Sequence, residues 1–199
     1  TIRMMGGIIE PTSGAISIGG IDLRKDPVAA KKMIGFVPDR PFLYEKLTGS
    51  EFLRFIADLY AVAPRTAARR AEELLRQFAL WNWGNEIIES YSHGMKQRLI
   101  IAAALLHDPK VMIIDEPMVG LDPEAVRQVR DILKELAQKN VTVFVSTHTL
   151  SLAEDLCDRI GVISRGTLLA EGTVAELNRA AKTGNAGLED VFLTLVREG

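Results

Sequence analysis

The chain has little of several features that would otherwise restrict its location and partners. It has one cysteine in 199 residues, Cys157, so no disulfide can form within it, and this composition fits a reducing compartment. Its longest apolar run, residues 99–106, is far shorter than the roughly 20 residues that a membrane-spanning helix needs. The 24 Lys and Arg nearly balance the 26 Asp and Glu, which argues against a general attraction to nucleic acid or anionic lipid. We therefore expect any role at a membrane to depend on a partner protein.

Short apolar stretches alternate with helical patterns along most of the sequence. Strands are expected at residues 15–18, 34–37, 111–114, 141–145 and 160–163. Helices are expected at residues 27–33, 95–106, 123–139, 150–157, 174–181 and 188–197, with a hairpin turn at Gly166. Strands that alternate with helices favour an α/β fold with a mostly parallel sheet.

Residues 48–92 interrupt this alternation with a purely helical pattern. Thr48 and Glu51 have the spacing of a capping box, in which each residue satisfies a free N–H of the other. Pro64 suits the first turn of a following helix. The apolar residues that recur at helical spacing after the capping box are Phe52, Phe55, Ile56 and Leu59. The segment is therefore predicted to be a helical subdomain inserted into the α/β fold.

Two acidic residues, Asp115 and Glu116, follow directly after the apolar stretch 111–114. In an open parallel sheet, ligands bind beyond the carboxyl ends of the strands, and burying an unpaired acid is costly. A hard cation such as Mg²⁺ takes oxygen ligands. We therefore expect Asp115 to hold Mg²⁺, directly or through water, and Glu116 to polarise a water that attacks a γ-phosphate. The alternative is a pair of solvated acids where the strand leaves the sheet.

Two other expected strands also end in polar residues. Asp39 comes shortly after the strand at 34–37, and His148 comes shortly after the strand at 141–145. Asp39 could reach the water shell of the metal, or it could only shape a turn. His148 could contact a terminal phosphate and orient the water, or it could make an ordinary structural hydrogen bond.

Two helix starts carry further candidates. Ser92 and Gly94 precede an apolar helix, whose N-terminus offers free N–H groups and the positive end of a dipole to an anion. Gly94 would let a phosphate approach the backbone and Ser92 could donate its hydroxyl, or the two could form a plain cap and turn. Asp122 is a good N-cap with Pro123 in the first turn, and a second role at a subunit contact rests on its closeness to Glu116.

The motifs and their order resemble the nucleotide-binding domain of an ATP-binding cassette (ABC) transporter, of a bacterial exporter-like branch. The matching positions are Asp39, residues 92–97, residues 111–116, residues 120–123 and His148. The resemblance covers essentially the whole chain. It implies a single P-loop NTPase-like domain over residues 1–199, with an α/β sheet and with the helical subdomain at 48–92 inside it.

The resemblance also implies roles for the residues at the strand ends. Asp115 would be the Walker B aspartate that holds Mg²⁺ beside ATP, and Glu116 would be the catalytic glutamate. His148 would be the switch histidine. Asp39 stands where the family usually has the Q-loop glutamine, so it keeps an oxygen ligand for the metal and adds a charge.

The signature loop of the family usually reads Leu-Ser-Gly-Gly-Gln, and here it reads Tyr-Ser-His-Gly-Met. Ser92, Gly94 and Met95 would touch the γ-phosphate of an ATP held by the opposite subunit. His93 and Met95 depart from the usual residues. Asp122 would lie in the D-loop of the family, near the subunit contact.

The phosphate loop of the family, Gly-x-x-x-x-Gly-Lys-Ser/Thr, occurs nowhere in the 199 residues. This loop normally cradles the phosphates with backbone N–H groups and supplies a lysine and a magnesium-binding hydroxyl. By resemblance, Thr1 would follow the loop directly. We therefore expect the chain to lack an N-terminal portion with this Walker A loop, and expect the 199 residues alone to be inactive.

The resemblance implies two such domains paired head to tail around two ATP molecules, as a homodimer or a heterodimer. Hydrolysis in the full-length protein would drive export through a separate integral membrane permease, at the inner face of the cell membrane and from the cytoplasmic side. The helical subdomain and the stretch after Asp39 would form the docking surface, and the permease would set the transported substrate. No nucleic-acid partner is expected. Two alternatives stay open, namely a soluble ATPase of the same superfamily acting on DNA or ribosomes, and a non-catalytic interaction module.

Overall fold

The computed structural model describes residues 1–40, 42–181, 183–184 and 186–198, with the backbone alone at residue 198. The chain forms two compact units, Thr1–Ser146 and Thr147–Gly199. Each unit has its own sheet and helices, and each is described here by itself.

The first unit is built on a parallel sheet with the strand order β3-β4-β5. The three strands are β3 (Ile34–Val37), β4 (Val111–Asp115) and β5 (Thr142–Ser146). Val37 lies opposite Ile114, and Ile114 lies opposite Val145, so the strands end at one edge of the sheet. The three strands expected from the apolar stretches are confirmed, and β4 and β5 each continue one polar residue further than expected.

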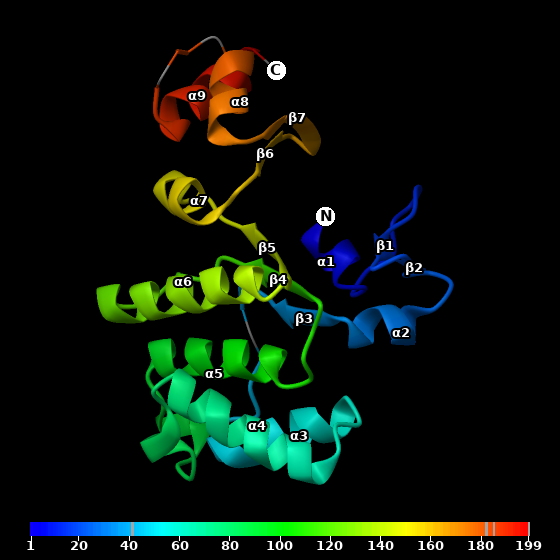
Figure 1. Ribbon diagram of the computed structural model, residues 1–199, viewed down its shortest axis with the longest axis vertical. Helices are drawn as coiled ribbons and strands as arrows, with labels where there is room; N and C mark the ends of the chain where they lie inside the picture. The colour runs from blue at the N-terminus through cyan, green and yellow to red at the C-terminus, as the bar shows by residue number, and fades with distance from the viewer. Residues whose placement is uncertain (41, 182, 185, 199) are drawn as a thin grey trace. The chain divides into compact units, whose positions relative to one another are not determined.

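Helices cover this sheet in layers. α5 (His93–Leu105) contacts β3 on one side, and contacts α3 (Gly49–Leu59) and α4 (Pro64–Gln77) on the other. Figure 1 shows α5 between the sheet and this helical pair. α6 (Pro123–Gln138) packs against β5. The first unit therefore combines a parallel sheet with a helical part attached through α5.

Local signals explain where these helices begin. The Thr48 hydroxyl accepts the N–H of Glu51 at 3.1 Å, and the Glu51 carboxylate accepts the N–H of Thr48 at 2.8 Å, which confirms the capping box. The backbone N–H of Thr48, and after it the Thr48 side chain, hydrogen-bond to the Glu51 carboxylate and hold its pKa below the ordinary value. α5 begins at His93, two residues earlier than expected, because Ser92 is its N-cap while its apolar pattern starts later.

Small elements precede β3 in the first unit. They are α1 (Ile2–Met5), β1 (Ser17–Ile18), β2 (Ile21–Asp22) and α2 (Pro27–Lys32). The strand expected at 15–18 is therefore shorter, and it pairs antiparallel with β2 across a turn of two glycines with positive φ. Side chains from these elements share a hydrophobic cluster with Ile34 and Ile113 of the sheet. Between α4 and α5 lie the single turns η1 (Trp81–Trp83) and η2 (Ile88–Ser90).

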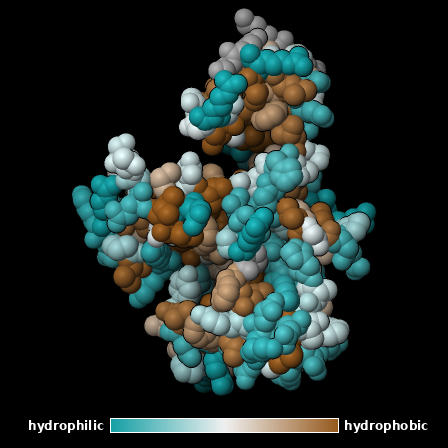
Figure 2. Space-filling view, turned by 180° about the vertical axis from the view of Figure 1, so that it is seen from behind, coloured by the Kyte–Doolittle hydropathy of each residue, from teal (hydrophilic) through white to brown (hydrophobic). Residues whose placement is uncertain are grey.

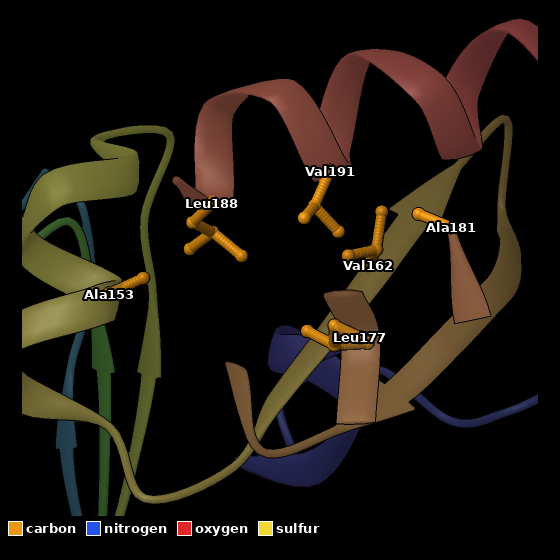
Figure 3. Packing of buried hydrophobic residues seen from close by; sticks show 6 residues of the cluster. All are labelled: Ala153, Val162, Leu177, Ala181, Leu188 and Val191. Carbon is orange, nitrogen blue, oxygen red and sulfur yellow. The ribbon is translucent and has the colours of Figure 1, made fainter. Parts of the chain in front are cut away.

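The second unit is an antiparallel hairpin packed against three helices. The hairpin is β6 (Ile160–Ser164) with β7 (Thr167–Gly172), and its turn at Arg165 and Gly166 has φ values of +48° and +81°. The helices are α7 (Leu150–Leu156), α8 (Val174–Ala180) and α9 (Leu188–Glu198). Their apolar side chains meet those of β6 in one cluster, in which Leu188 and Val191 of α9 lie near Val162 (Figure 3).

Hydrophobic side chains also reach the surface in patches among hydrophilic ones (Figure 2). Two large examples in the first unit are Phe42, which is 79% exposed, and Leu59, which is 64% exposed. In the residues that the structure describes, no helix is both long enough and apolar enough to cross a bilayer.

The core of the second unit predicts a localised loss of stability. Leu188 is 1% exposed, so Leu188→Ala should leave a cavity and cost roughly 2–5 kcal/mol. Leu193 on the same helix is 44% exposed, and Leu193→Ala should change stability by less than about 0.5 kcal/mol. Hydrogen exchange of the β6 and β7 amides checks both variants. Equal protection in the two variants would contradict the packing of α9 on this hairpin.

Candidate active site

The parallel strands of the first unit bring polar residues together at their carboxyl ends. Asp115, the last residue of β4, lies opposite Ser146, the last residue of β5. The Ser146 hydroxyl donates a hydrogen bond of 2.8 Å to Oδ1 of Asp115. Because Met112, Ile113 and Ile114 before it are fully buried, Asp115 emerges directly from the core at this edge. The expectation of a buried strand that ends in an acid is thus confirmed.

Glu116 follows with a φ of +52°, a left-handed conformation that is uncommon for a residue with a side chain. Its N–H donates a hydrogen bond of 2.9 Å to the carbonyl oxygen of Ser146. The hydrogen bonding between the β4 and β5 segments thus extends by one residue, to Glu116, before the chain leaves the sheet. Backbone strain of this kind concentrates at functional sites, where the surrounding structure enforces it.

The donor set around Asp115 fits a magnesium ion that is also bound by phosphate. Mg²⁺ usually takes only one or two protein carboxylates and completes its shell with waters and phosphate oxygens. Among the residues described, no three His, Cys, Asp or Glu side chains gather into a metal-binding group. Asp115 with the Ser146 hydroxyl therefore suits a shared metal better than a closed protein cage. Asp39 is exposed two residues beyond β3, and its role as a metal ligand stays a prediction.

The N-terminus of α5 is accessible at the signature loop. The Ser92 side chain accepts the N–H of Met95 at 3.3 Å, and Ser92 itself is exposed. A methyl group built on Gly94 would meet only the Leu121 side chain, at 3.5 Å, so the backbone there is open to a small anion. Met95 is 9% exposed and belongs to the core. The roles of Ser92, Gly94 and Met95 in nucleotide binding stay predictions.

The structure gives the positions of two more candidate residues, Asp122 and His148. Asp122 is the N-cap of α6, and its Oδ1 accepts the N–H of Ala125 at 2.9 Å, with Pro123 at the first helical position. This confirms the capping interpretation and leaves the subunit role open. His148 belongs to the second unit, where it is an exposed residue shortly before α7.

Comparison with known proteins decides the family. A sequence model of the family described as "ABC transporter" matches residues 1–119, which is more than half of the chain. The chain belongs to the ABC transporter family. Members of this family bind ATP, and the family carries the α/β fold with a parallel core sheet and a helical subdomain that the first unit shows.

Several proteins are closely similar to this ABC family member. The linearmycin resistance ATP-binding protein LnrL of Bacillus subtilis (strain 168) is 36% identical over 205 residues, covering 99% of this chain and 65% of LnrL. A solved ATP-binding subunit of an ABC transporter has a TM-score of 0.91 at 35% identity, covering 98% of this chain and 81% of that one. The dimeric ATP-binding cassette MJ0796 bound to ADP and Pi has a TM-score of 0.78 at 26% identity, covering 87% of this chain and 78% of that one. The chain thus spans less than two thirds of the length of LnrL.

Sequence reasoning missed Ser146 as a partner of Asp115 in this ABC domain. The signal was present, because a hydroxyl residue directly follows the apolar stretch 141–145. Its hydrogen bond depends on the register between β4 and β5, which no local pattern reveals.

His107, which follows α5, is a structural residue in this ABC domain. Its ring stacks on Tyr60, with centroids 3.7 Å apart and planes 13° from parallel. Its Nε2 lies 3.0 Å from the carbonyl oxygen of Ile34, and because a carbonyl only accepts, Nε2 carries the proton. Its Nδ1 is buried without a hydrogen-bond partner in the part of the chain that the structure describes. Burial lowers the pKa of His107 below its ordinary 6.5, more than the bond to Ile34 raises it.

The lowered pKa predicts a pH-dependent contribution of His107 to stability. As the pH falls below about 6.5, the unfolded chain takes up a proton at this position before the folded chain does, so the stabilisation is lost on acidification. His107→Phe keeps a ring against Tyr60 and removes the titration. Urea unfolding between about pH 8 and pH 5 should show the wild-type advantage over this variant shrinking towards acid. A constant difference at all pH values would contradict the assignment.

Proposed function

We propose that the full-length protein is the ATP-binding subunit of an ABC transporter and hydrolyses ATP to drive export through a separate membrane subunit. The observation that carries the proposal is the carboxyl edge of the β4–β5 pair. There Asp115 is fixed by the Ser146 hydroxyl, and Glu116 is held by the Ser146 carbonyl. This edge is where an open parallel sheet binds ligands, and two adjacent acids there suit metal-assisted attack of water on a phosphate.

The proposal assigns a role to each residue of the candidate site. Asp115 would hold Mg²⁺, which would neutralise charge on the phosphates. Glu116 accepts the proton of the attacking water, and His148 orients that water. In a head-to-tail dimer, Ser92 and Gly94 at the N-terminus of α5 bind the γ-phosphate of the ATP held by the other subunit. The similarity to the MJ0796 cassette, which is dimeric and bound to ADP and Pi, supports a nucleotide-binding dimer.

Three further site residues fit the same proposal. Met95 contributes its backbone to the signature loop, since its side chain is buried. Asp122 caps α6 and would lie near the subunit contact, and Asp39, which follows β3, would reach the water shell of the metal. The signature loop, residues 91–95, begins at the end of the helical subdomain at 48–92 and continues into α5.

The phosphate loop is proposed to lie in polypeptide outside the 199 residues. The sequence contains no Gly-x-x-x-x-Gly-Lys-Ser/Thr, yet the other motifs are present. β5 supports this reading, because its apolar side chains are only partly covered, and Phe144 is 38% exposed. A parallel strand with apolar residues on both faces is normally covered by neighbours. The 199 residues alone are therefore proposed to be inactive.

The membrane partner is proposed to dock on a groove of about 600 Å³ beside α3. Phe42, Tyr44 and Phe55 line the groove. The Phe42 and Tyr44 rings meet edge to face at 5.6 Å, and the Tyr44 and Phe55 rings meet at 5.2 Å. An exposed aromatic groove suits an apolar helix of a permease at the inner face of the cell membrane. The name of LnrL, a resistance protein, favours export over import.

Two other functions are less well supported. A soluble ATPase acting on DNA or ribosomes would be favoured by a strongly basic face, but the net charge is −2. A non-catalytic interaction module would follow if no phosphate loop exists in the full-length protein. A measurement of ATP binding by the full-length protein distinguishes the non-catalytic module from the proposed ATPase.

Glu116→Gln tests the catalytic role. In the full-length protein this variant should still bind ATP but hydrolyse it about 100-fold more slowly or worse, because it removes the general base while keeping the shape. Glu124→Gln, at an exposed acid in the first turn of α6, is the matched control and should hydrolyse ATP at the wild-type rate. Phosphate release and equilibrium ATP binding measure the two effects.

The outcomes of this experiment distinguish the alternatives. Wild-type turnover by the Glu116→Gln variant would remove Glu116 from the reaction. Failure of the full-length wild type to bind ATP would instead favour the non-catalytic module.

Phe42→Ser tests the docking groove. The substitution removes an aromatic side chain that a partner would bury, so the affinity for the membrane subunit should fall about tenfold or more. Val28→Ser changes another highly exposed apolar residue, on α2 outside the helical subdomain, and should leave the affinity unchanged. Co-purification of the membrane subunit with each variant measures the effect, and equal recovery would refute the groove as the docking surface.

A further inference from the structure

The imidazole of His93 lies against the backbone of Gly120. A methyl group built on Gly120 would be 2.3 Å from Cδ2 and 2.6 Å from Nε2 of His93, closer than nonbonded carbon atoms approach. Gly120 also has a φ of +75°, in the left-handed region that favours glycine. Two independent constraints therefore require glycine at position 120, and one of them is the ring of His93.

Gly120 belongs to the tight turn that starts at Glu116. The N–H of Val119 donates to the carbonyl of Glu116 at 3.4 Å, and the N–H of Leu121 donates to the carbonyl of Met118 at 3.3 Å. With Glu116 itself held in a left-handed conformation, these bonds keep the turn compact. A shift of Glu116 is therefore transmitted along only a few residues to Gly120.

The same turn touches the first turn of α5 at two adjacent positions. His93 is the first residue of α5 and contacts Gly120, and Leu121 lies beside Gly94. Beyond its first turn, α5 is mostly buried between the sheet and the helical pair. It therefore cannot shift without moving the core residues packed against it. The turn after Glu116 and the start of α5 must therefore move together.

We propose that His93 is a positioning residue that couples the two ATP sites of the dimer, an inference that rests on the proposed function. In that dimer Glu116 serves the ATP of its own subunit, whereas Ser92 and Gly94 serve the ATP of the other subunit. The His93–Gly120 contact joins these two groups within one chain. The position of Glu116 at one ATP then constrains the positions of Ser92 and Gly94 at the other ATP. Such a constraint gives a coupling free energy between the two sites.

The contact itself is tested by a double-mutant cycle in the full-length protein. Gly120→Ala should destabilise the fold by backbone strain and by collision with His93. Gly20→Ala is the matched control, because Gly20 has a φ of +83° and nothing within 4 Å of an added methyl group. In a His93→Ala background, the cost of Gly120→Ala should fall to that of Gly20→Ala, as measured by urea unfolding.

The coupling is tested in the full-length protein by the ATP dependence of hydrolysis. Wild type should show a Hill coefficient above 1, with an upper limit of about 2 for two sites. His93→Ala should lower it towards 1. His93→Gln should restore cooperativity, because its side-chain amide can reach the place of the imidazole Nε2. A purely structural role would change the stability and leave the Hill coefficient unaltered.

Three results would overturn the inference: an equal cost of Gly120→Ala in both backgrounds, a wild type that hydrolyses ATP without cooperativity, or a His93→Ala variant with wild-type cooperativity. A full-length wild type with no ATP turnover would overturn the proposed function itself. That outcome is distinguishable, because the stability cycle on His93 and Gly120 is independent of nucleotide.

Discussion

The pairing of β4 with β5 is the constraint on which the site depends. Its register sets Asp115 opposite Ser146 and lets the Ser146 carbonyl accept the N–H of Glu116. A slip of one residue would turn every side chain of β5 to the other face and separate the hydroxyl from the carboxylate. The fully buried residues of β4 oppose such a slip, because Met112 and Ile114 would lose the neighbours that they pack against. The positions of the two acids are therefore a consequence of core packing one strand length away.

Local patterns predicted the parts of this arrangement that depend on local physics. The apolar stretch before Asp115 predicted a buried strand, and the Thr48–Glu51 spacing predicted a capping box that the hydrogen bonds confirm. The hairpin at Gly166 was also predicted, because glycine readily adopts the positive φ of a tight turn, and the structure confirms it with a φ of +81°. The start of α5 was placed too late, because the apolar pattern begins after the cap at Ser92.

The relations that give the site its geometry were not predictable in the same way. The bond between Ser146 and Asp115 joins residues 31 positions apart, and the contact of His107 with Ile34 spans 73 positions. Such contacts depend on which strands are neighbours and on how a helix lies over them. The family resemblance supplied roles for the site residues, but it offered none for His93, where this sequence departs from the usual glycine. The structure gives His93 a specific neighbour in Gly120.

α5 takes part in non-local contacts at both of its ends. Its first turn carries His93 against Gly120, and Lys96 forms an ion pair of 2.5 Å with Glu45 beside the aromatic groove. Its last turn is held by Arg70, whose guanidinium donates to the carbonyl of Leu105 at 2.9 Å. A helix that is buried along most of its length and held at both ends moves as a rigid body, since its packing permits few intermediate positions. The turn after Glu116, Glu45 in the groove and the helical pair thus all contact one rigid helix. A displacement of any of them would therefore shift the N-terminus of α5.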